Sequence, residues 1–131
     1  MVVLDTNILI YFFRGQGRVA ENLLATPPKE VAIPAISVYE LEVGIAKSAQ
    51  PAKRRQQFDR LLEVIAILPF DKGAAVAAAR IRSVLEKAGR PIGPLDTLIA
   101  GTALAHHAAL VTHNIREFKR VPNLTLIDWY D

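Results

Sequence analysis

The sequence predicts a single α/β domain built around a largely parallel β-sheet. Short apolar runs, several of them rich in β-branched residues, alternate with longer helical segments along the whole chain. The chain has 131 residues, enough for one hydrophobic core and too few for two. It contains no internal repeat and no low-complexity tract.

The expected strands are short and apolar, as buried strands of parallel sheets are. Residues 2–4 read Val-Val-Leu, and residues 31–33 have the same character and stop at Pro34. A third apolar run is closed in the same way by Pro69. About five strands are expected, at residues 2–4, 31–33, 65–68, 110–112 and 124–127.

Capping residues, prolines and a glycine mark the helix boundaries. Thr6 or Asn7 is expected to cap the first helix, Pro51 to separate the third helix from the fourth, and Gly89 to follow the end of an alanine-rich helix. The expected helices cover residues 8–13, 19–25, 37–47, 52–64, 73–88 and 95–107, followed by a helical turn at 115–119.

Composition and charge exclude several classes of protein. With 51% apolar and 22% charged residues the chain is expected to be globular, and no apolar run approaches the roughly 20 residues that span a bilayer. The absence of cysteine excludes disulfides, thiolate metal sites and a cysteine nucleophile. Because there is no signal-peptide pattern either, a cytoplasmic protein is expected. The net charge of +3 is compatible with a polyanionic partner but does not by itself indicate one.

Four polar residues stand where expected strands end or expected helices begin. Asp5 and Asn114 follow strands, whereas Glu40 and Asp96 lie in first helical turns. Ligands of open parallel sheets bind outside the carboxyl ends of the strands. The sequence therefore predicts that three acids and one amide from distant parts of the chain meet at one edge of the sheet.

Each helical acid also has a purely structural interpretation. Ser37-x-x-Glu40 and Asn114-x-x-Glu117 both fit the capping box, in which the acid bonds back to the cap residue. Asp96, two residues after a proline, would complement the helix dipole. Asp5 is harder to explain in this way, since Thr6 and Asn7 can supply the cap without it.

Converging carboxylates, without cysteine or clustered histidine, suit a hard cation. Mg²⁺ prefers oxygen ligands in near-octahedral geometry and keeps several waters, and Mn²⁺ behaves similarly. Such an ion lowers the pKa of a bound water and neutralises charge on a phosphodiester. No serine lies in a pattern that suggests a hydrolase triad.

Four stretches resemble the PIN-domain ribonucleases, and most closely the VapC toxins of bacterial and archaeal toxin–antitoxin pairs. They are "LDTN" at 4–7, "SVYELEVG" at 37–44, "GRPIGPLDTLIAGTAL" at 89–104 and "LVTHNIREFKRVPNLTLIDW" at 110–129. The resemblance covers essentially the whole chain and implies a three-layer α/β/α fold in one PIN domain spanning residues 1–131. It also implies RNA cleavage that depends on Mg²⁺ or Mn²⁺, a homodimer, and inhibition by a VapB-like antitoxin.

The resemblance assigns roles position by position. Asp5, Glu40 and Asp96 match the family's catalytic, metal-binding acids, whereas Glu42 is expected to point away from Glu40. The expected supporting residues are Thr6, Asn7, Thr112 and Asn114.

Position 114 departs from the family pattern, because many PIN domains carry an aspartate where this chain has Asn114. A neutral amide contributes less to binding a second cation. Glu117 is expected to cap its helix and face the surface rather than to compensate for the missing charge.

Two residues are expected RNA contacts: Arg90, whose loop leads to Asp96, and His113, beside Asn114. The other basic groupings, including Lys53-Arg54-Arg55, are interpreted mainly as solvated helix faces. Two alternatives remain. One is a non-catalytic RNA-binding or protein-interaction PIN domain. The other is a phosphoaspartyl enzyme, which would require an acid at position 7, where this chain has Asn7.

Overall fold

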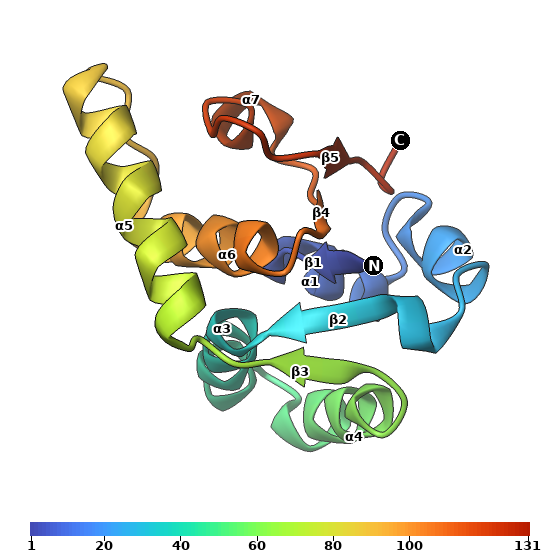
Figure 1. The fold of residues 1–131 in the computed structure, drawn as a ribbon. Helices are drawn as coiled ribbons and strands as arrows, with labels where there is room; N and C mark the ends of the chain where they lie inside the picture. Colours follow the sequence, from blue (N-terminus) through green and yellow to red (C-terminus); the bar gives the residue numbers. More distant parts are fainter.

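The structure is a computed structural model that describes all 131 residues. Five parallel strands form one sheet in the order β3-β2-β1-β4-β5, so the first strand lies at the centre (Figure 1). The strands are β1 (Val2–Leu4), β2 (Val31–Pro34), β3 (Ala66–Leu68), β4 (Ala109–Val111) and β5 (Leu126–Ile127).

Seven α-helices and one short 3-10 helix connect the strands. They are α1 (Thr6–Arg14), α2 (Val19–Leu24), η1 (Pro28–Glu30), α3 (Ala35–Ala46), α4 (Pro51–Leu62), α5 (Lys72–Lys87), α6 (Pro94–Ala105) and α7 (Ile115–Phe118). No helix is both long and apolar enough to cross a membrane.

Two hydrophobic cores lie on opposite faces of the sheet. In β1, Leu4 packs into the core built with α1 to α4, whereas Val3 packs into the core built with α5 to α7. The neighbouring strand β4 divides its side chains in the same way, with Val111 on one face and Leu110 on the other. This alternation, expected of pleated strands, produces the three-layer α/β/α fold that the sequence resemblance implied.

Helices α5 and α6 approach each other very closely on one face (Figure 1). A Cβ atom on Gly101 would lie only 2.7 Å from the backbone nitrogen and the Cβ of Ala78, so glycine is required at this crossing. At the end of α5, Gly89 adopts a φ of +68° just beyond the helix, which confirms its expected role as a terminating residue.

Local details differ from the sequence predictions at the starts of helices. The cap of α1 is Asp5 itself, whose carboxylate accepts the N–H of Thr6, rather than Thr6 or Asn7. Helix α3 begins directly after Pro34, so Ser37 lies inside the helix and donates its hydroxyl to the Leu4 carbonyl at 3.3 Å. The predicted Ser37–Glu40 capping box is therefore wrong.

The end of the sheet also differs from the prediction. Strand β5 covers two residues instead of the predicted 124–127, because the preceding segment turns through Asn123, whose φ is +65°. The 3-10 helix η1 was not predicted. It begins at the second of two consecutive prolines, whose fixed φ suits the first position of a helical turn.

Candidate active site

The central strand delivers Asp5 to the carboxyl edge of the sheet. Its backbone N–H bonds to the Val111 carbonyl at 2.9 Å, which extends the β1–β4 pairing by one residue. One carboxylate oxygen accepts the Thr6 N–H at 2.8 Å, and the other accepts the Thr112 hydroxyl at 2.9 Å. Because Asp5 is only 4% exposed, these bonds fix the direction in which its remaining lone pairs point.

A hydroxyl joins Glu40 to the same edge. Glu40 lies in the second turn of α3 and is partly buried, and its carboxylate accepts the Thr6 hydroxyl at 2.7 Å. Thr6 thus binds Asp5 through its backbone and Glu40 through its side chain. Glu42 is paired with Arg55 instead, which confirms that it points away from this network.

Asp96 lies in the first turn of α6, after the helix cap Gly93. A Cβ atom on Gly93 would lie 3.4 Å from an Asp96 carboxylate oxygen and 3.7 Å from a Glu117 carboxylate oxygen. The carboxylates of Asp96 and Glu117 therefore lie on the same side of this glycine. The position of Asp96 in the first helical turn agrees with the interpretation that its charge complements the helix dipole.

Glu117 belongs to the site, although its spacing from Asn114 predicted a capping role at the surface. Its carboxylate accepts the Gly93 N–H and the Asn114 side-chain amide, both at 2.8 Å. A capping box would instead have Glu117 accept the Asn114 backbone N–H, which is donated to the Thr112 hydroxyl at 3.0 Å. The predicted capping box is therefore wrong. The sequence signal that could have placed Glu117 in the site is its three-residue spacing from Asn114, which puts both side chains on one helix face.

Burial, together with repulsion between the carboxylates, disfavours the ionised forms of Asp5 and Asp96 at this edge. Burial, followed by the charges of Glu40 and Glu117, raises the pKa of Asp5 to about 6, against the lowering effect of its hydrogen bonds. Burial, followed by the charges of Asp5, Glu117 and Glu40, raises the pKa of Asp96 to about 7. The Gly93 N–H lowers the pKa of Glu117, which therefore stays ionised.

The donor set fits a divalent cation. No lysine or arginine is among the main causes of the pKa shifts of Asp5 and Asp96, and the cation that acts at this edge is Arg120, whose charge lowers the pKa of Glu117. The carboxylate oxygens of this site are not tightly clustered. One group of three potential metal ligands has all its atoms within 4.8 Å of one another, and it lies elsewhere in the molecule, at His113, Asp128 and Asp131. This spacing suits an ion that keeps several waters, as Mg²⁺ does.

Three of the four supporting residues predicted around the acids join the hydrogen-bond network. They are Thr6, Thr112 and Asn114. Asn7 is exposed, and its side chain makes no hydrogen bond within the chain, so its supporting role stays a prediction.

The two predicted RNA contacts lie in different surroundings. Arg90 is exposed in the loop after α5, whereas His113 stacks on Tyr130 with a centroid separation of 4.2 Å and bonds to Asp128 at 3.0 Å. Asp128 also accepts the Tyr130 N–H, so the group of His113, Asp128 and Asp131 is largely satisfied by internal bonds. RNA contact by Arg90 and His113 stays a prediction.

Comparison with known proteins gives the same class throughout. Residues 2–124 match the PIN domain family. The chain is 37% identical over 129 residues to Ribonuclease VapC2 of Rickettsia felis, covering 97% of this chain and 96% of that protein. It is 33% identical over 127 residues to tRNA(fMet)-specific endonuclease VapC of Shigella flexneri, with the same coverage.

Solved structures share the fold over nearly the full length. VapBC2 from Rickettsia felis bound to a DNA fragment from their promoter superposes with a TM-score of 0.91 at 36% identity, covering 98% of this chain and 99% of that one. FitAcB from Neisseria gonorrhoeae superposes with a TM-score of 0.87 at 30% identity, covering 99% of both chains.

A parallel α/β/α domain with acids at the carboxyl edge of its strands, matched in this way, belongs to the PIN-domain family. Its full-length relatives are VapC ribonucleases, which confirms the resemblance seen in the sequence.

Proposed function

We propose that the protein is a metal-dependent endoribonuclease, the toxin of a VapBC-type toxin–antitoxin module, and that all 131 residues act as one PIN domain. The observation that supports this best is the convergence of four carboxylates, Asp5, Glu40, Asp96 and Glu117, at one sheet edge, where the pKa values of Asp5 and Asp96 are raised. The relatives named as ribonucleases and as a tRNA(fMet)-specific endonuclease support RNA as the substrate class.

Asp5, Glu40 and Asp96 are the proposed ligands of Mg²⁺ or Mn²⁺, directly or through waters. When bound, the ion supplies an activated water and neutralises charge that develops on the phosphodiester. Thr112 and the Thr6 N–H hold the Asp5 carboxylate in one orientation, and the Thr6 hydroxyl holds Glu40. Bonds from neighbouring groups that orient ligands in this way typically affect metal affinity about 10- to 100-fold.

No competing catalytic group is present in the network. Ser37 is fully buried, and its hydroxyl is bonded to the Leu4 carbonyl, so it is not poised as a nucleophile. The non-catalytic alternative rested on Asn114, but Asn114 has a defined partner here, since it donates to Glu117. An intact hydrogen-bond network of this kind favours a working site.

The proposed partners follow from the same relatives. Solved neighbours include a toxin–antitoxin complex from Klebsiella pneumoniae, at 27% identity and a TM-score of 0.79. A VapB-like antitoxin that covers the acidic edge, a homodimeric toxin and a cytoplasmic location, where RNA substrates are found, are accordingly expected.

Cleavage of RNA by the purified protein tests the proposal. Asp5→Asn and Asp96→Asn remove proposed ligands, so each is expected to reduce the Mg²⁺- or Mn²⁺-dependent rate more than about 100-fold, because losing the ion's stabilisation costs several kcal/mol. Glu42→Gln is the matched control, since Glu42 pairs with Arg55 outside the network. A correctly folded Asp5→Asn protein that cleaves RNA at the parent rate would refute the mechanism.

A further inference from the structure

A groove of about 660 Å³ opens beside the acidic edge, between α1, α3 and α4. Glu40 lines it and so belongs both to the groove and to the hydrogen-bond network of the site. Gly44 lies one turn further along α3, and a Cβ atom there would meet nothing within 4 Å, so this part of the wall is open. The groove therefore leads away from the carboxylates along the surface.

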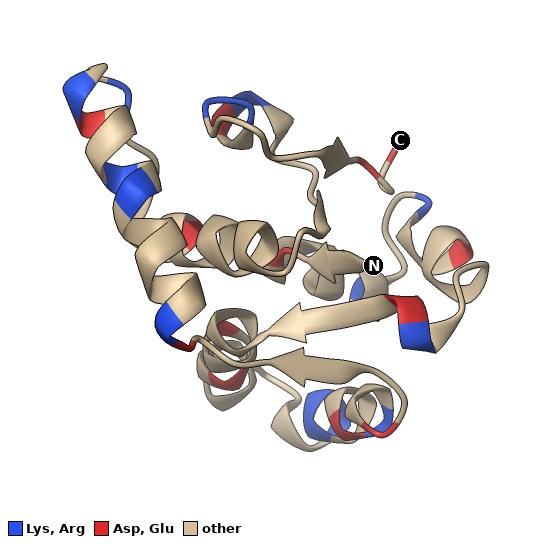
Figure 2. Ribbon diagram, viewed as in Figure 1, with Lys and Arg blue, Asp and Glu red and all other residues tan.

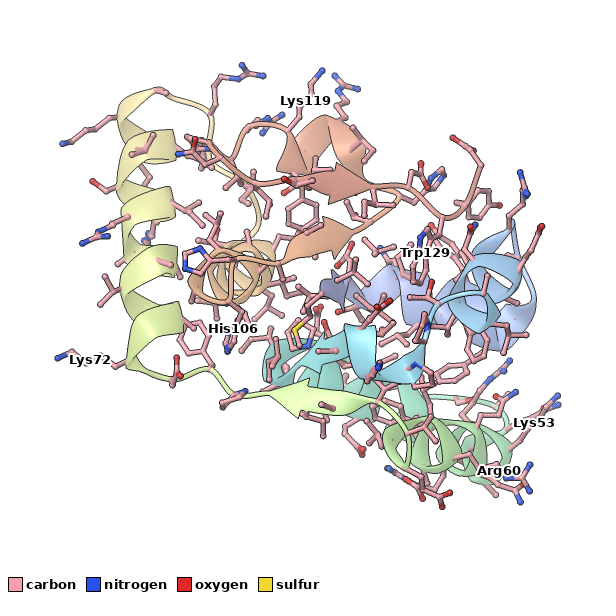
Figure 3. The ribbon with its side chains drawn as sticks, turned by 45° about the vertical axis from the view of Figure 1, so that its right-hand side comes forward. Lys53, Arg60, Lys72, His106, Lys119 and Trp129 are labelled. Atoms are coloured by element: carbon pink, nitrogen blue, oxygen red, sulfur yellow. The ribbon has the colours of Figure 1, made fainter.

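Four cations line this groove, and Glu40 is its single acid. They come from the end of α1, the end of α3 and the first turn of α4, and they are Arg14, Lys47, Lys53 and Arg54. Figure 2 shows Lys and Arg positions gathered on α4, and Figure 3 shows Lys53 extending into solvent there.

None of the four has a carboxylate within 4.0 Å, because the ion pairs of this structure involve other cations, Arg18, Arg55, Arg82 and His113. Arg54 is held in place by neutral groups: it donates to the Phe13 carbonyl at 3.1 Å and to Gln57 at 2.9 Å. Its charge is thus fixed in position and not neutralised. The structure separates it from its neighbour Arg55, which pairs with Glu42 and Asp59.

We propose that this groove binds the sugar–phosphate backbone of the RNA strand that enters the acidic edge, with Arg14, Lys47 and Lys53 contacting phosphates. This inference rests on the proposed function and adds the path of the substrate. Unpaired cations from three separate elements, facing one groove that ends at an acidic site, match a polyanion that must bring one phosphodiester to the metal. The aromatic ring of Phe13 on the same wall offers a surface on which a base can stack.

RNA binding without cleavage tests this path. The double variant Arg14→Ala/Lys53→Ala is compared with Lys72→Ala/Lys87→Ala, which removes the same charge from exposed positions on α5, well away from the groove (Figure 3). A fluorescent single-stranded RNA of about 12 nucleotides is titrated in EDTA at several salt concentrations.

The groove variant is expected to bind the RNA about tenfold more weakly than the parent. The slope of the logarithm of the RNA-binding constant against the logarithm of the salt concentration is expected to fall in magnitude by about 1.4, which corresponds to the loss of two phosphate contacts to a single strand. In cleavage assays its KM should rise while kcat stays near the parent value. The α5 control should keep the parent affinity and slope. Thermal unfolding confirms that both variants are folded.

Parent-like RNA affinity and slope in the groove variant would overturn the inference. It would be overturned equally if that variant kept RNA binding but lost binding to an acidic peptide, a result that would assign the groove to a protein partner. Because binding is measured without metal, failure here is distinct from failure of the proposed function, which is decided by whether Asp5→Asn abolishes cleavage.

Discussion

Asn114 is a hydrogen-bond donor in this site, and that role explains why the position carries an amide. Its side chain donates to Glu117 at 2.8 Å, and Glu117 in turn accepts the N–H of Gly93, at the start of the helix that carries Asp96. An aspartate at 114 would lack the donor and would face a carboxylate. Glu117, three residues later, brings a carboxylate to the same part of the site.

Asn114→Asp is therefore expected to destabilise the metal-free protein by about 1.5–3 kcal/mol, the usual range for losing a hydrogen bond to a charged group. Added Mg²⁺ should recover part of this loss, because the new carboxylate adds to the metal-binding charge. Urea unfolding in EDTA and in Mg²⁺ measures both effects, with the exposed Asn123→Asp as control. Equal stability of Asn114→Asp and parent in EDTA would show that the Asn114–Glu117 bond does not matter.

Glu117 is expected to position Asp96 and to add charge at the metal. Glu117→Gln keeps the shape but loses the charge and weakens the bond from Gly93, so Mn²⁺ affinity should fall about 10- to 100-fold. Calorimetric titration with Mn²⁺ measures the change, and Glu86→Gln, on the exposed face of α5, is the control. An unchanged Mn²⁺ affinity would show that Glu117 has a structural role and does not contribute to metal binding.

At the scale of elements, the crossing of α5 and α6 fixes where the acidic edge lies on that face. Gly101→Ala would put a methyl group 2.7 Å from Ala78, so we expect a loss of about 1–3 kcal/mol in the free energy of unfolding. Gly44→Ala, a helical glycine with open space around it, is expected to stabilise by up to about 1 kcal/mol. Urea unfolding of the two variants gives the comparison, and a neutral Gly101→Ala would mean that the two helices can separate at little cost.

Local patterns in the sequence were enough to predict the strands, the α-helices and their order, but not the 3-10 helix η1. Short apolar runs and proline or glycine boundaries are properties of neighbouring residues, so β1, β2 and the end of α5 lie within one residue of where they were predicted. The roles predicted for Ser37 and Glu117 were wrong because their partners, Leu4 and Gly93, are 33 and 24 residues away. A capping motif has the same local spacing whether or not a distant partner competes for the side chain.

At the scale of the molecule, the parallel sheet brings acids from distant segments to one edge, where burial first and neighbouring carboxylate charges second disfavour their ionised forms. Folding thus makes Asp5 and Asp96 harder to ionise, from a usual value of 3.8 to about 6 and about 7. Well below pH 3.8 both groups are protonated in the folded and in the unfolded state, so they do not change the free energy of unfolding. As pH rises through the folded values, the folded state must release protons it holds more tightly than the unfolded chain does, so stability falls.

The metal-free protein is accordingly expected to lose stability between about pH 4 and pH 7, and Asp5→Asn is expected to lose less because one of the titrating groups is gone. The stability of Asp5→Asn relative to the parent should rise by about 1–3 kcal/mol across that range in EDTA, in proportion to the pKa shift of one buried carboxyl.

Saturating Mn²⁺ should remove this difference in stability, because the ion stabilises the ionised parent and binds the variant poorly. Urea unfolding at both ends of the range, with and without Mn²⁺, measures it, and Glu86→Gln, which changes an exposed carboxylate on α5, should track the parent throughout. A difference between Asp5→Asn and parent that stays constant with pH in EDTA would mean that Asp5 is ionised at no cost, and the electrostatic case for a cation at this edge would fail.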